Sequence, residues 1–165
     1  MQKLLGLLLV LCLVGGCKKS PAPPRAPDQD SLELQYGKMP EKLPLSPESA
    51  PIVEAWKEFS ALGGSMDVLY KATNNEDLAL AVDDLIEKEK ELSAGNYPPN
   101  FDLQQVKSRQ LVLRTYLYRL KASIEENQPT TQPTVEMLQA YNALRKQLNL
   151  LVKNQLDTQL ILDAN

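Results

Sequence analysis

The positions of proline limit what this chain can fold into more than any other feature. Eight of its 12 prolines lie between residues 18 and 51, and the other four fall at two points, Pro98–Pro99 and Pro129 with Pro133. Proline fixes φ and lacks a backbone N–H, so it is excluded from helix interiors. The sequence therefore divides into a proline-rich N-terminal segment and a remainder that is interrupted at only two places.

The remainder carries apolar residues at the three- and four-residue spacing of amphipathic helices. We predict a helix that follows Pro51, one that begins near Asn74, one that begins at Asp102, and a last one capped by Thr134 or Thr131. The two longest apolar seams consist of Leu103, Val106, Gln110, Leu113, Leu117, Leu120 and Ile124, and of Met137, Tyr141, Leu144, Leu148 and Leu151. No segment alternates like a core strand, and helices joined by short links pack antiparallel. The predicted fold is all-α: an antiparallel up-down four-helix bundle after a Pro-rich disordered tether.

Helix ends are predicted from three local signals. The segment 74–77 supplies a turn, an N-cap and first-turn acids, and Gly95 is a suitable C-terminal cap residue. Asp102 is expected to start the third helix, with Gln105 at the capping-box position.

Gly63–Gly64 lies in the middle of the first predicted helix and costs about 1 kcal/mol per glycine relative to alanine. Either the helix kinks there or a neighbour packs unusually close, and the small residues of the segment 79–81 are the candidate neighbour. A three-helix body with a swinging first helix is the alternative fold.

Composition excludes several classes of site. The chain has no histidine, which removes the usual general base and the imidazole metal ligands. The net charge of −3, without a block of basic residues, argues against binding to nucleic acid. Asp83, Asp84 and Glu87 share one turn, but lysines follow closely, so a solvated acidic face is expected there. We expect no metal and no cofactor.

The first 16 residues have the pattern of a secretory leader. Lys3 precedes an apolar run of 11 residues, Leu4–Val14, which is too short to span a bilayer as a helix of about 20 residues. The only two cysteines, Cys12 and Cys17, lie here, so neither can cross-link the predicted helices.

Val14–Cys17 resembles the lipobox of bacterial lipoproteins, in which an aliphatic residue and two small residues precede an obligatory cysteine. The resemblance implies cleavage between Gly16 and Cys17 and attachment to the membrane through acyl chains on Cys17. Lys18 after the cysteine then favours the outer over the inner membrane of the bacterial cell envelope. A plain secretory leader that leaves a free Cys17 thiol is the alternative.

The implied organisation is a signal peptide at 1–16, a lipid-anchored Pro-rich tether at 17–48 and a four-helix bundle at 49–165. A fully extended tether of about 30 residues reaches roughly 90 Å at about 3.1 Å per residue. The helical part resembles small helical envelope lipoproteins without an assigned function.

Candidate partner-contact residues lie in two places. Tyr97 and Phe101 belong to an aromatic loop that either contacts a partner or plugs the end of the core. Arg114 and Tyr118 lie on the third helix, where Arg114 belongs to a basic stripe with a seven-residue spacing (Lys107, Arg114, Lys121). This stripe either binds an acidic partner or pairs with the acid-rich second helix.

The function predicted from these features is that of a lipid-anchored, non-enzymatic envelope protein that holds a protein partner at a distance from the membrane. One alternative is a helical bundle that binds a small ligand or lipid in a cavity near Gly63–Gly64. A second alternative is a hydrolase that uses carboxylates or a Ser/Lys pair.

Overall fold

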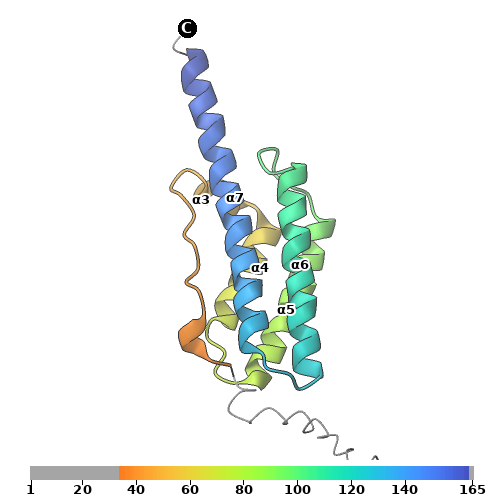
Figure 1. The fold of residues 1–165 in the computed structure, drawn as a ribbon. Helices are drawn as coiled ribbons and strands as arrows, with labels where there is room; N and C mark the ends of the chain where they lie inside the picture. Colours follow the sequence, from red (N-terminus) through yellow and green to blue (C-terminus); the bar gives the residue numbers. More distant parts are fainter. Residues whose placement is uncertain (1–33, 164–165) are drawn as a thin grey trace, which may run out of the picture.

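The computed structural model describes residues 34–163, with the side chains of all of them except Tyr36 and residues 158–163 (Figure 1). The predicted leader, Cys17 and the tether up to residue 33 lie outside the described residues. Within residues 34–163 the secondary structure is helical, as predicted, and contains no strand. A 3-10 helix, η1 (Tyr36–Lys38), precedes five α-helices: α3 (Ala50–Ala55), α4 (Lys57–Leu69), α5 (Asn75–Ala94), α6 (Gln104–Glu125) and α7 (Thr131–Asp163).

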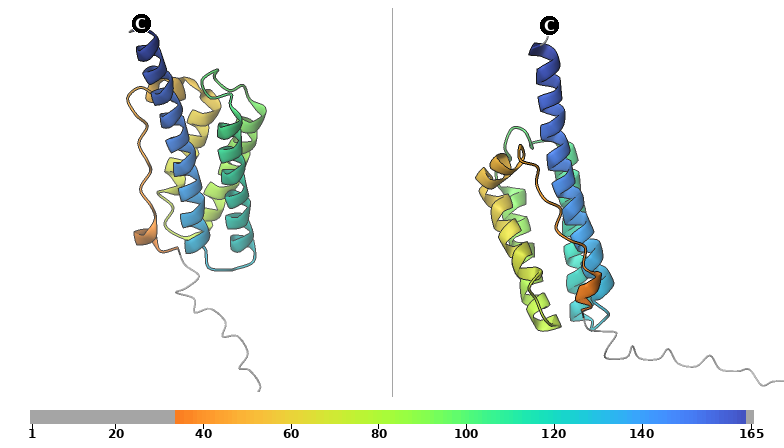
Figure 2. Two further views of the ribbon diagram at one scale, coloured as in Figure 1. Left: turned by 45° about the horizontal axis from the view of Figure 1, so that its top comes forward. Right: turned by 90° about the vertical axis from the view of Figure 1, so that its left-hand side faces the viewer.

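Helices that follow one another in the chain pack side by side. α4 lies against α5, α5 against α6 and α6 against α7, while α3 lies against α4. Figures 1 and 2 show that the C-terminal part of α7 extends past the other helices. The described chain contains five packed α-helices rather than the four predicted, because the first predicted helix is divided.

The division of the first predicted helix lies at Trp56 and not at Gly63–Gly64. Trp56 has φ −84° and ψ 92°, which ends α3 and begins α4. This extended backbone turns the indole into the core, where it stacks on Phe59 with ring centroids 5.3 Å apart. The Ser60 hydroxyl donates to the Val53 carbonyl oxygen at 3.1 Å and satisfies an acceptor near the end of α3. Burial of the tryptophan ring therefore accounts for the break.

α4 continues without interruption through Gly63 and Gly64. A Cβ added at Gly63 would lie 3.6 Å from the Tyr141 hydroxyl, which is an ordinary contact, and one at Gly64 would meet nothing within 4 Å. The predicted kink is therefore absent, and the neighbour of Gly63 is Tyr141 of α7 rather than the segment 79–81.

Two of the three predicted helix ends are confirmed. Asn74 caps α5, and its side chain accepts a hydrogen bond from the Asp77 N–H at 2.8 Å. Gly95 is the C-cap of the same helix. The prediction for α6 is wrong, because its N-cap is Leu103 and the Asp102 carboxylate pairs with Lys107 instead, at 2.5 Å.

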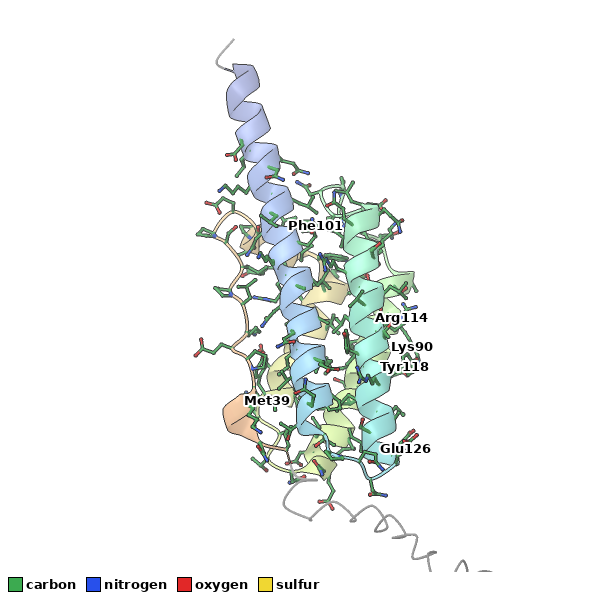
Figure 3. All side chains as sticks on the ribbon, viewed as in Figure 1. Met39, Lys90, Phe101, Arg114, Tyr118 and Glu126 are labelled. Carbon is green, nitrogen blue, oxygen red and sulfur yellow. The ribbon has the colours of Figure 1, made fainter. Side chains whose placement is uncertain are left out.

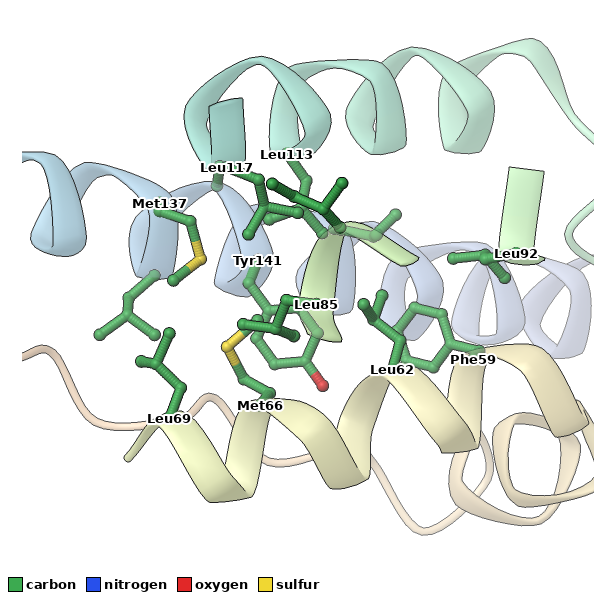
Figure 4. Close-up of a cluster of buried hydrophobic side chains, with 14 of the residues drawn as sticks. Phe59, Leu62, Met66, Leu69, Leu85, Leu92, Leu113, Leu117, Met137 and Tyr141 are labelled. Carbon is green, nitrogen blue, oxygen red and sulfur yellow. The ribbon is translucent and has the colours of Figure 1, made fainter. Parts of the chain in front are cut away.

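The predicted apolar seams form the core, part of which Figure 4 shows. Every seam residue of α7 is buried. In α6 the five central seam residues are buried, and Leu103 and Ile124 at its ends are partly buried. Tyr141 of α7 stacks on Phe59 of α4 with ring centroids 6.3 Å apart, which joins α4 and α7 across the core.

Residues 34–49, which we name the strap, run alongside α7 (Figures 1 and 2). The sequence predicted a disordered tether up to residue 48. In the structure, however, the backbone N–H groups of Gln35, Leu43 and Ser46 donate to side chains of α7, and Leu34 is buried. The proline-rich composition does exclude a regular helix here, but the strap obtains its hydrogen bonds from another element.

Gly64→Ala should raise the free energy of unfolding by about 0.5–1 kcal/mol. Alanine loses less conformational entropy than glycine in a helix, and the added methyl group would meet nothing within 4 Å. Urea unfolding followed by far-UV circular dichroism measures the change. Gly95→Ala is the matched control, because Gly95 ends α5 and a Cβ there would lie 3.0 Å from Glu58 Cγ. A destabilised Gly64→Ala variant, or an equal gain from both substitutions, would contradict the open position of Gly64.

Candidate functional site

A surface pocket of about 500 Å³ lies where the loop between α5 and α6 meets the first turns of α6. We name it the Tyr97 pocket. It contains two of the predicted contact residues, Tyr97 and Arg114. Its lining residues are Ser93, Gly95, Asn96, Tyr97, Asp102, Lys107, Gln110, Leu111 and Arg114.

A buried carboxylate lies beneath this pocket. The side chain of Glu89 on α5 is 1% exposed and accepts hydrogen bonds from Arg114 Nε at 2.6 Å and Nη2 at 3.0 Å. Glu89 Oε1 also accepts from Gln110 Nε2 at 2.9 Å, and Gln110 Oε1 in turn accepts from the Tyr97 hydroxyl. A buried charge is tolerated only when it is paired and hydrogen-bonded. The network therefore ties the loop, α5 and α6 together.

Sequence reasoning missed Glu89, which it did not distinguish from the other acids of the acid-rich second helix. A signal was present, because Glu89 occupies the apolar seam of α5 between Ile86 and Leu92. Gln110 holds the corresponding polar position in the seam of α6. Two polar residues in facing apolar seams are typical of a buried hydrogen-bonded pair.

Three groups of the Tyr97 pocket, Tyr97, Lys107 and Arg114, have raised pKa values and keep their protons at neutral pH. Burial raises the pKa of the Tyr97 hydroxyl. The hydrogen bond to Asp102 raises the pKa of Lys107, and the hydrogen bond to Glu89 raises that of Arg114. Lys107 Nζ also lies 5.2 Å from the centre of the Tyr97 ring. These three groups are hydrogen-bond donors or cations at neutral pH, which suits binding rather than proton abstraction.

Phe101 does not belong to the surface. Its side chain is 0% exposed and stacks on Trp56 with ring centroids 5.9 Å apart. Tyr97 is partly buried against the same indole at 5.1 Å. The loop therefore closes the end of the core, which is the plug interpretation of its aromatic residues.

Tyr118 lies one turn beyond Arg114 on α6 and is 46% exposed. Figure 3 shows it close to Arg114 and Lys90. Leu111 and Val112 of the same helix are also exposed, at 58% and 41%. Tyr118 follows Leu111 by seven residues and therefore lies on the same face of α6, beside the Tyr97 pocket, whereas Val112 lies about 100° around the helix.

The predicted charge pairing between α5 and α6 is confirmed for two of the three basic residues in the stripe. Arg114 pairs with Glu89 at 2.6 Å, and Lys121 pairs with Asp83 at 2.7 Å. Lys107 pairs instead with Asp102, outside α5.

The three carboxylates of the acidic cluster on α5 are all bonded to neighbouring side chains. Asp83 pairs with Lys121, and Glu87 pairs with Lys90 at 2.7 Å. Asp84 accepts a hydrogen bond from the Ser65 hydroxyl at 2.5 Å. Among residues 34–163 no group of three or more acidic or thiol side chains is placed to hold a metal ion.

Comparison of the chain with known protein families, with curated proteins and with solved structures found no match. None of the helices between residues 34 and 163 combines the length and the apolar character needed to cross a bilayer.

Phe101→Ala should lower the free energy of unfolding by about 3–5 kcal/mol, because it removes a fully buried ring from the core. Tyr118→Ala is the matched aromatic control and should change stability by less than about 0.5 kcal/mol, since its ring is on the surface. Thermal or urea unfolding of the two variants measures both effects. Similar stabilities for the two variants would show that Phe101 is not part of the core.

Proposed function

We propose that this protein is a lipid-anchored, non-enzymatic protein of a bacterial cell envelope that holds a partner protein near the membrane. The observation that carries the proposal is the sequence Val14–Cys17 directly after an apolar run of lipoprotein-leader length. Two or more acyl chains hold a protein firmly, whereas one chain anchors it only marginally. Lys18 after the cysteine favours the outer membrane.

The helical part is proposed to act as a rigid body built on an antiparallel up-down four-helix arrangement of α4, α5, α6 and α7. Support comes from the successive packing of these helices and from the Phe59–Tyr141 contact between the first and the last. A rigid body at the end of a tether presents one surface to a partner, and the length of the tether limits its distance from the membrane.

The proposed partner surface comprises the Tyr97 pocket and the exposed residues Leu111 and Tyr118 of α6. Apolar and aromatic side chains next to a pocket with charged and amide groups are typical of contact surfaces. The charges of the pocket are already balanced within the protein, since Lys107 pairs with Asp102 and Arg114 with Glu89. This favours binding over catalysis at this site.

The two alternative functions receive less support. Gly63 lies against the Tyr141 hydroxyl and Gly64 faces open space, so these glycines do not enclose a ligand. A Ser/Lys hydrolase needs a lysine that gives up its proton near neutral pH. In the Tyr97 pocket the pKa of Lys107 is raised, which is the opposite change.

Cys17→Ser should abolish incorporation of labelled fatty acid and leave the uncleaved precursor. The serine hydroxyl does not replace the thiol that accepts the diacylglycerol in lipoproteins. Labelling of bacterial cells with palmitate, followed by membrane fractionation, measures both outcomes. Cys12→Ser is the matched control and should be labelled and anchored like the unchanged chain. Continued labelling of Cys17→Ser would contradict the proposed anchor.

A photo-crosslinking amino acid at Tyr118 should capture a discrete envelope protein in intact cells, identified by mass spectrometry. The same amino acid at Glu76, an exposed position at the start of α5, is the control and should not capture it. The absence of any adduct at Tyr118, or the same adducts at both positions, would count against this surface. Because the crosslink does not depend on lipidation, this result is independent of the test of Cys17.

A further inference from the structure

The asparagine side chain at position 142 of α7 binds the strap at two backbone groups. Asn142 Oδ1 accepts the Leu43 N–H at 2.8 Å, and its Nδ2 donates to the Glu41 carbonyl oxygen at 2.8 Å. One amide thus binds the carbonyl of one strap residue and the N–H of the residue two positions later.

Asn149 repeats this arrangement. Its Oδ1 accepts the Ser46 N–H at 2.9 Å, and its Nδ2 donates to the Pro44 carbonyl oxygen at 3.1 Å. The two asparagines are therefore bonded to two identical backbone units of the strap, three residues apart. We name Asn142, Arg145 and Asn149 the α7 ladder.

The spacing of this ladder matches the period of an extended proline-type helix. Seven residues of α7 rise about 10.5 Å over about two turns, so Asn142 and Asn149 lie on one face. Three residues of a polyproline II segment rise about 9 Å over one turn, so every third residue also presents the same face. The ladder is therefore suited to any segment with this backbone geometry.

The hydrogen-bonding pattern also sets where proline is tolerated. The ladder uses the N–H groups of Leu43 and Ser46, and the residue directly after each of them is proline, Pro44 and Pro47. Proline at these positions costs no hydrogen bond to the ladder and restricts the backbone to the extended form. A proline at position 43 or 46 would remove a donor that the ladder needs.

Arg145 lies between the two asparagines and is 9% exposed. Its Nε donates to the Leu43 carbonyl oxygen at 2.5 Å, and its Nη1 donates to the Tyr141 hydroxyl at 3.3 Å. Both of these acceptors are neutral. A carboxylate from another segment would form a stronger, charge-assisted hydrogen bond with this guanidinium.

The opposite wall of the groove belongs to α4 and its C-terminal end. The Tyr70 hydroxyl donates to the Pro40 carbonyl oxygen at 3.0 Å, and burial raises the pKa of Tyr70 to about 12, so the hydroxyl stays a donor. Lys42 of the strap pairs with Asp67 of α4. An unfilled space of about 420 Å³ remains beside the strap here, lined by Leu34, Met39, Leu69 and their neighbours. The strap and the end of α4 thus leave a surface pocket between them.

We propose that the groove between α4 and α7 is a docking site for an extended, proline-containing segment of a partner protein, and that the strap is the internal occupant which that segment displaces. The segment needs two N–H groups three residues apart with proline directly after each, and an acidic residue near Arg145 strengthens its binding. The proposal rests on contacts within residues 34–163 and does not depend on the lipid anchor.

The test uses the full chain with a weakened strap, Lys42→Ala/Leu43→Pro, which loses the ion pair to Asp67 and one donor to Asn142. The probe is a fluorescent peptide with the sequence of residues 39–48. By fluorescence anisotropy this peptide should bind the weakened chain at least tenfold more tightly than the unchanged chain, because the unchanged strap competes from within the same molecule. Asn142→Leu/Asn149→Leu in the weakened chain should abolish binding.

Two further peptides test what the groove recognises. In the first, Leu43 trades places with Pro44 and Ser46 with Pro47, so composition is unchanged but the required donors are lost, and binding should fall at least tenfold. In the second, Pro44 and Pro47 are kept and all other residues are alanine, and binding should stay within about tenfold. Equal binding of the exchanged peptide overturns the proposal. Loss of binding by the alanine peptide also overturns the proposal, because the groove would then recognise only the side chains of its own strap. A dimer in which two chains exchange straps, detected by light scattering, overturns it for the same reason.

Hydrogen exchange of the unchanged chain provides a second measurement that needs no variant. Millimolar strap peptide should speed the exchange of the Leu43 and Ser46 amides, whereas the exchanged peptide should not. If neither peptide alters the exchange of these amides, the groove does not accept a segment from outside and the proposal is wrong.

Discussion

Burial of the Trp56 ring is the interaction on which most of this structure depends. The ring contacts Phe59 of α4 and both Tyr97 and Phe101 of the loop between α5 and α6. Protein interiors are close-packed, so a ring that contacts several elements fixes their relative positions. The Trp56 ring therefore determines the break between α3 and α4, the closed end of the core and the position of the Tyr97 pocket. The buried indole N–H has no partner among the described residues, which costs about 1–3 kcal/mol that the ring contacts must offset.

α7 connects this core to the strap because one side of the helix packs in the core and the adjacent side forms hydrogen bonds with the strap. One side carries the apolar seam that includes Tyr141 and packs against the other helices. The adjacent side carries Asn142 and Asn149, which supply the hydrogen bonds that a proline-rich backbone cannot make with itself. The strap is therefore ordered by the side chains of a helix about 100 residues later in the chain.

Sequence periodicity predicted the elements whose buried face can be recognised from their own residue spacing. The seams of α6 and α7 and the cap at Asn74 follow from spacing and residue type alone, and they are confirmed. The break at Trp56 was not predicted, because it depends on rings that are more than 40 residues away, such as Phe101. The same reason applies to the strap, since nothing in its own composition indicates that Asn142 will bind its backbone.

For the candidate site, too, the sequence predicted some features and missed others. Arg114 and Tyr97 were singled out from their types and positions, and the structure brings both to one pocket. Glu89 was missed because six other acids surround it in α5, and only its place in the seam distinguishes it. Phe101 was correctly located in the loop, but whether an aromatic loop residue faces solvent or core depends on Trp56. Residue type and spacing in the sequence thus identified candidate residues, whereas contacts with distant residues determine whether each one lies in the core or at the surface.

The proposed lipid anchor and the proposed displacement of the strap would together couple binding in the groove to the reach of the protein. While the strap lies on α7, only residues 18–33 separate Cys17 from the helical body, and at about 3.1 Å per residue they span at most about 50 Å. Displacement of the strap adds residues 34–49 to this linker and roughly doubles that distance. A partner segment that occupies the α7 ladder would thus release the body farther from the membrane. Proline-rich composition suits both states, because the strap needs no helix when bound and stays extended when released.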